Sequence, residues 1–85
     1  MTAKDATQAP IAVSQQIDAK GLNCPLPILK AKKAFGTLVS GEVLRVLSTD
    51  PGSVQDFAAF CNQTGNTLLS SATSDGAFEF LIRKA

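Results

Sequence analysis

The sequence contains no histidine, no tryptophan and no tyrosine, and only two cysteines. Without histidine, the chain cannot build a Ser-His or Cys-His catalytic pair from its own residues. Cys24 and Cys61 alone make neither a disulfide framework nor the ligand set of a tetrahedral zinc site. No cofactor-binding motif is present. We therefore expect no metal and no cofactor, and sulfur is left as the main source of chemistry.

Charge and hydropathy exclude further classes of protein. The formal net charge is only +1, which argues against direct binding of nucleic acid. No stretch approaches the roughly 20 apolar residues of a membrane span, so no membrane association is expected. Residues 1–10 lack the basic start and apolar run of a signal peptide and are typical of a flexible leader. We therefore expect a cytoplasmic protein with reduced thiols and a single domain over residues 11–85.

The hydrophobic pattern predicts six elements. Strands are expected at 11–18, 42–49, 67–72 and 78–84, with a first helix over 25–38. A second helix opens at 50–53 and stops at Gly65. The order β-α-β-α-β-β predicts a two-layer α/β sandwich of the α+β type. In this fold two helices cover one face of a four-stranded mixed sheet.

Apolar residues at three- and four-residue steps predict the buried face of each helix. The expected face of the first helix consists of Ile28, Ala31, Ala34, Phe35 and Leu38. The expected face of the second consists of Val54, Phe57, Ala58 and Cys61. Without Trp and Tyr, the aromatic core must come from five phenylalanines, namely Phe35, Phe57, Phe60, Phe78 and Phe80.

Cys24 is the strongest candidate for a functional residue, because it stands between a predicted strand and a predicted helix. The free N–H groups and the dipole at a helix start favour a thiolate, the nucleophilic form of cysteine. Gly21 breaks the strand, and Pro25 and Pro27 stiffen the junction. The helix starts either directly after Cys24 as N-cap or at Pro27, because Leu26 precedes a proline. Either start presents the sulfur outward.

Asp50 is expected near Cys24. If the first two strands and the helix between them form a crossover unit, these strands run parallel and end at the same edge of the sheet. Cys24 follows the first strand and Asp50 follows the second. Sites of α/β sheets lie at this edge. Asp50 also fits the N-cap of the second helix, with Pro51 as the first helical residue, and Ser53 with Asp56 is a competing cap.

The other polar candidates have two interpretations each. Cys61 shares a helical face with Phe57 and is expected to pack in the core. Lys30 and Lys33, together with Lys32, lie on the helix that starts at Cys24. They form either a solvated face or a patch that docks a partner.

Residues 18–30 resemble the TusA/SirA-like family of sulfur carrier proteins. The hallmark of that family is Cys-Pro-x-Pro after a strand, preceded by Gly-Leu. Here Gly21, Leu22, Cys24, Pro25 and Pro27 match it. The resemblance extends to 49–51, 60–61 and 80–84, and covers about 17–84.

The resemblance implies a persulfide relay rather than an enzyme that turns over small molecules. By its place in the motif, Cys24 accepts sulfane sulfur from a cysteine desulfurase or a rhodanese-like protein. It then passes the sulfur to a cysteine of a downstream protein. Asp50, Lys30 and Lys33 match regions near partner interfaces in the family. We expect the carrier by itself to be a monomer.

The resemblance leaves the pathway open. Family members serve tRNA thiolation, molybdenum cofactor synthesis or sulfur oxidation. The best-known tRNA-thiolation members carry charged residues where this chain has Asn23 and Leu26. A role in sulfur oxidation or general sulfur trafficking is therefore as compatible with the motif as tRNA thiolation.

Two alternatives remain from the sequence. A thiol redox module would pair Cys24 with Cys61, which requires an exposed Cys61 with Cα atoms no more than about 7 Å apart. Leu26-Pro27 occupies the place where a Cys-x-x-Cys protein carries its resolving thiol. A regulatory or nucleic-acid-binding module is permitted by the fold alone, but the near-neutral charge argues against it.

Overall fold

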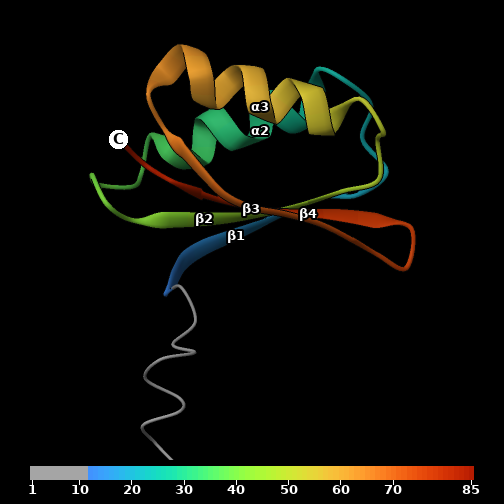
Figure 1. Cartoon of the computed structure of the whole chain (residues 1–85), viewed down its shortest axis with the longest axis horizontal. Coiled ribbons are helices and arrows are strands. Elements are labelled where there is room, and N and C mark those ends of the chain that lie inside the picture. The colour runs from blue at the N-terminus through green and yellow to red at the C-terminus, as the bar shows by residue number, and fades with distance from the viewer. Residues whose placement is uncertain (1–11) are drawn as a thin grey trace, which may run out of the picture.

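A computed structural model of the protein describes residues 12–85, so the predicted leader and Ile11 lie outside the described residues. The elements are β1 (Val13–Ala19), α2 (Leu26–Phe35), β2 (Val43–Ser48), α3 (Ser53–Thr64), β3 (Thr67–Ser74) and β4 (Ala77–Arg83). Figure 1 shows both helices on one side of the sheet. The predicted two-layer α/β sandwich is confirmed. Within residues 12–85, no helix has the length and apolar character needed to cross a membrane.

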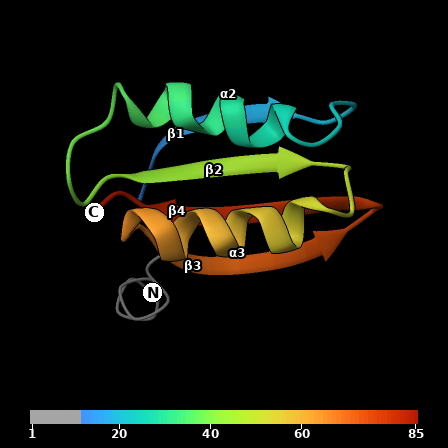
Figure 2. The ribbon, with the colours of Figure 1, turned by 90° about the horizontal axis from the view of Figure 1, so that it is seen from above.

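The sheet has the strand order β1-β2-β4-β3. β1 and β2 are parallel, with Ile17 opposite Val46, whereas β4 is antiparallel to both β2 and β3. Because α2 crosses over between two parallel strands, β1 and β2 end at the same edge of the sheet. Figure 2 shows α2 beside α3, with β2 visible between them. α2 contacts β1 and β2, and α3 contacts β3 and β4.

The core lies between the helices and the sheet, and all five phenylalanines belong to it or pack against it. Phe57 is fully buried. Its ring stacks on Phe80, with centroids 4.9 Å apart, and meets Phe60 edge-on at 6.4 Å. Cys61 is also buried in this cluster. The phenylalanine core and the placement of Cys61 are therefore confirmed.

α3 begins later than predicted. Its N-cap is Gly52 and no side chain caps it, so the predictions of an Asp50 cap and of Pro51 as the first helical residue are wrong. Ser53, the competing cap, uses its hydroxyl elsewhere: it lies 2.6 Å from the hydroxyl of Ser48, and both side chains are buried. Ser48 Oγ also accepts the N–H of Asp50 at 3.2 Å. These contacts tie the end of β2 to the start of α3.

The buried faces of the helices differ from the prediction in two places. Val54 and Ala58 are exposed, and Phe60 packs in the core instead. The face of α3 that meets the sheet runs through positions 53, 57, 60 and 61, so 54 and 58 fall on its margin. α2 ends at Phe35 rather than at Leu38, although Leu38 is still buried from the following turn.

β3 and β4 form an antiparallel hairpin. Asp75 and Gly76 have positive φ angles of 52° and 77°. Two central residues of this kind make the hairpin turn whose twist matches that of the strands. β3 extends to Ser74, two residues beyond its predicted end.

Candidate functional site

The loops that follow β1 and β2 are hydrogen-bonded to each other at one edge of the sheet. Gly21, with a φ of 85°, turns the chain out of β1, and its N–H donates to Thr49 Oγ1 at 2.9 Å. The N–H of Cys24 donates to Asp50 Oδ2 at 3.2 Å. The parallel strands thus bring Cys24 and Asp50 together as the sequence predicted. Asp50 anchors the backbone of the cysteine loop rather than capping α3.

The two prolines of the motif have different environments. α2 begins at Leu26 with Pro25 as N-cap, so the helix start lies between the two predicted positions. Pro25 is exposed beside Cys24, and the peptide bond that joins them is cis. Pro27 is fully buried. Its fixed φ suits the first turn of a helix, so it anchors α2 directly below the exposed cysteine.

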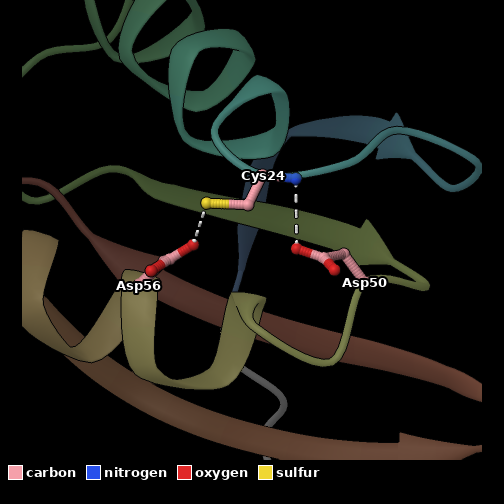
Figure 3. A group of neighbouring side chains, drawn as sticks. All are labelled: Cys24, Asp50 and Asp56. Atoms are coloured by element: carbon pink, nitrogen blue, oxygen red, sulfur yellow. Dashed lines mark hydrogen bonds between the residues drawn. The ribbon is translucent and has the colours of Figure 1, made fainter.

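The sulfur of Cys24 is exposed and lies against a carboxylate. Its S–H donates to Asp56 Oδ2 at 2.7 Å. Figure 3 shows Cys24 between two aspartates, with its sulfur toward Asp56 and its backbone nitrogen toward Asp50. The hydrogen bond to Asp56 raises the pKa of the Cys24 thiol. Desolvation and the negative charges of Asp56 and Asp50 act in the same direction.

The prediction that the start of α2 favours a thiolate at Cys24 is therefore wrong. Pro25 and Pro27 have no N–H to offer, and the N–H of Leu26 donates to Asn23 O at 2.8 Å. Of the three residues that follow Cys24, two therefore have no N–H and the third uses its N–H within the loop. Two carboxylates from another part of the chain favour the protonated thiol instead.

Cys24 lies at a groove of about 220 Å³ between α2 and α3. The groove is lined by Cys24, Pro25, Ile28, Lys32, Asp56, Ala59, Phe60 and Gln63. Its walls are mostly apolar, and Lys32 and Asp56 are the charged residues of its lining. Such a groove beside an exposed thiol offers a place for a second molecule to contact the protein.

The structure does not bring Lys30 and Lys33 into this groove. Both line a separate hollow on the β1 side of α2, together with Gln15 and Ile17. Lys30 Nζ also donates to Asp18 O at 2.8 Å, which ties α2 to the end of β1. Of the three lysines considered for docking, Lys32 is the one on the cysteine side.

Asp56 was not predicted as part of the site, because its place in the sequence suggested a helix cap. One signal was available. Asp56 lies in the first turn of α3, and the N-terminus of α3 opens at the same edge as Cys24. The sequence does not give the distance between α2 and α3, and this distance decides that the Asp56 carboxylate contacts the sulfur.

Cys61 does not meet the requirement of the redox alternative. It is buried, with 6% of its surface exposed, and burial raises the pKa of its thiol. Both cysteines are free thiols. A dithiol mechanism needs an exposed second sulfur, so the structure argues against pairing Cys24 with Cys61.

Within residues 12–85, Cys24, Asp50 and Asp56 form one group whose ligand atoms all lie within 4.8 Å of one another, close enough to hold a metal ion. A structural zinc site has four ligands, most of them Cys or His. This group offers one thiol and two carboxylates, and each already takes part in a hydrogen bond within the protein. We assign no metal to it.

Comparison with known proteins identifies the family. Residues 15–84 match the family described as sulfurtransferase TusA. The sulfur carrier protein TusA of Allochromatium vinosum is 59% identical over 71 residues, which are 84% of this chain and 93% of that protein. The crystal structure of a SirA-like protein from Desulfitobacterium hafniense has a TM-score of 0.73 and 31% identity, covering 81% of this chain and 95% of that chain. The chain belongs to the TusA family.

Proposed function

We propose that this protein is a sulfur carrier that holds sulfane sulfur as a persulfide on Cys24. In the uptake step, the Cys24 sulfur attacks the outer sulfur of a donor persulfide. The S–S bond of the donor breaks, and the donor leaves as a thiol with the proton that Cys24 gives up. In the delivery step, an acceptor cysteine attacks the outer sulfur on Cys24. The outer sulfur moves from Cys24 to the acceptor cysteine, and the number of thiols and persulfides stays the same.

The observation that carries the proposal is an exposed Cys24 sulfur with no second accessible thiol among residues 12–85. A thiol that attacks the inner sulfur of a persulfide on Cys24 releases the outer sulfur as sulfide and leaves a disulfide. The burial of Cys61 prevents that loss inside the protein. Membership of the TusA family and the name of the Allochromatium relative, a sulfur carrier protein, support the same function.

The partners in this proposal are proteins. A cysteine desulfurase or a rhodanese-like protein supplies the sulfur, and a cysteine of a downstream protein accepts it. The groove beside Cys24 is a suitable place for either partner to contact the carrier. The accepted sulfur serves tRNA thiolation, molybdenum cofactor synthesis or sulfur oxidation in the cytoplasm. The protein acts as a relay in this scheme, and the partners contribute the remaining chemistry.

Intact-mass measurement tests the proposal directly. The full-length protein is incubated with a cysteine desulfurase and cysteine, or with a rhodanese and thiosulfate. We expect a gain of about 32 Da, the mass of one sulfur atom, that is reversed by a reductant. Cys24→Ser is expected to show no gain. Cys61→Ala is the matched control and is expected to load like the wild type.

The outcomes separate the sulfur carrier from the redox alternative. No gain with either donor system would refute the sulfur carrier. A loss of 2 Da in place of a gain, abolished by both Cys24→Ser and Cys61→Ala, would indicate an internal disulfide and the redox module.

A further inference from the structure

We propose that Asp56 is a positioning residue for sulfur uptake. Its carboxylate accepts the S–H of Cys24 in the carrier without bound sulfur, and this hydrogen bond must break before the sulfur can attack. This inference rests on the proposed sulfur-carrier function. It adds a residue that the Cys-Pro-x-Pro motif does not contain. It also gives the empty and the loaded carrier different contacts at the same position.

Two carboxylates, those of Asp50 and Asp56, accept different hydrogen bonds from Cys24. Asp50 Oδ2 accepts the backbone N–H of Cys24 and so positions the loop. Asp56 Oδ2 accepts the S–H and so positions the sulfur itself. Asp56 comes from α3, whereas Cys24 precedes α2. The contact between Asp56 and Cys24 therefore holds the sulfur toward the groove between the two helices (Figure 3).

The charges around the sulfur act mainly against its ionisation. The charged groups that act on Cys24 are Asp50 from the β2–α3 loop and Asp56 from α3, and Lys32 from α2 lines the same groove. Within residues 12–85, neither aspartate is paired with a cation within 4.0 Å. No ion-paired cation in this part of the chain therefore offsets either carboxylate beside the thiol. This agrees with the raised pKa of Cys24 and with a sulfur held as a neutral thiol.

The hydrogen bond to Asp56 needs the proton of the Cys24 thiol, and Cys24 loses this proton when it takes up sulfur. In uptake, Cys24–SH and R–S–SH become Cys24–S–SH and R–SH, and the proton on Cys24 passes to the leaving donor sulfur. The inner sulfur of the new persulfide is bonded to carbon and to the outer sulfur, and it carries no hydrogen. It therefore cannot donate to Asp56, and its lone pairs face a negative carboxylate. Asp56 thus holds the empty thiol and disfavours the same position for the loaded sulfur.

The test measures how readily Cys24 ionises when Asp56 loses its charge. Full-length wild type and Asp56→Asn are alkylated with iodoacetamide between pH 6 and pH 11, a range of roughly 2.5 units on either side of an ordinary thiol pKa of about 8.5. Mass spectrometry counts the modification at Cys24. We expect the alkylation midpoint of Asp56→Asn to shift to lower pH and its rate at pH 7 to rise. Asparagine has nearly the same shape as aspartate but no charge, so the midpoint would stay unchanged only if the Asp56 carboxylate did not lie at the sulfur.

Glu42→Gln is the matched control. It also removes one negative charge and keeps the oxygen that accepts the N–H of Val39. It precedes β2 at the end opposite to Asp50, so its alkylation profile is expected to equal that of the wild type. Asp56→Ala gives a second measurement if the asparagine variant does not fold, and circular dichroism checks both variants.

Unchanged midpoints in the folded Asp56 variants would overturn the inference about Asp56. That result is independent of whether Cys24 carries sulfur, because iodoacetamide needs no donor protein. Failure of the wild type to gain sulfur would instead refute the proposed function. A shifted midpoint together with normal loading of the wild type supports both.

Discussion

The buried hydroxyl pair of Ser48 and Ser53 joins β2 to α3 beneath the site, and removing it should destabilise the protein in a specific pattern. The two oxygens lie 2.6 Å apart, and the side chains are 0% and 1% exposed. Ser53→Ala removes one partner, but Ser48 Oγ still accepts the N–H of Asp50. Ser48→Ala leaves both the Ser53 hydroxyl and the Asp50 N–H without this partner.

The expected magnitudes follow from the cost of an unpaired buried polar group, about 1–3 kcal/mol. Ser53→Ala should lower the free energy of unfolding by about 1 kcal/mol, and Ser48→Ala by about 2 kcal/mol. The double variant has no unpaired hydroxyl left. Its loss should therefore be smaller than the sum of the two single losses by about 1 kcal/mol, within the usual range for residues in contact.

Urea unfolding followed by circular dichroism measures all four proteins of this cycle. In thermal unfolding, a loss of 1 kcal/mol corresponds to a fall in Tm of roughly 4–8 °C for a domain of this size. Additive losses, within about 0.3 kcal/mol, would refute the idea that these hydroxyls form one buried pair. A larger loss for Ser53→Ala than for Ser48→Ala would refute the assignment of the second contact to Asp50.

Two further predictions concern the core and the two thiols. Phe57→Ala should lower the free energy of unfolding by about 3–5 kcal/mol in urea, because Phe57 is fully buried against Phe80; the exposed Val54→Ala should change it by less than about 0.5 kcal/mol. Folding raises the pKa of Cys24 and Cys61, so their stabilising contribution is complete below an ordinary thiol pKa of about 8.5 and is lost as the pH rises through the folded pKa values. Urea titrations at increasing pH should show this decline, reduced in Cys61→Ala, and a flat profile would contradict it.

Much of the fold could be predicted because its signals are local. The hydrophobic pattern predicted the last strand over 78–84, and Phe80 and Ile82 on this strand are buried. The predicted ends of helices were less accurate where a side chain could bind either its own helix or another segment. Asp50 is a good N-cap by type, yet its carboxylate accepts the N–H of Cys24 from another loop.

What the sequence by itself determined is the position of the sulfur. Gly21 turns the chain out of β1, Pro27 fits the first turn of α2, and Cys24 lies exposed in the loop between them. The parallel pairing of β1 and β2, inferred from the crossover, also placed Asp50 at the same edge.

Only the tertiary structure decided which groups surround that sulfur. The separation and rotation of α2 and α3 place Asp56 on the thiol and Lys32 in its groove, and they direct Lys30 and Lys33 to the far side of α2. These contacts depend on how two helices pack over one sheet, and spacing along the chain does not specify that packing. The protonation of Cys24 follows from the same contacts, because nearby carboxylates, and not the helix start, dominate its electrostatic environment.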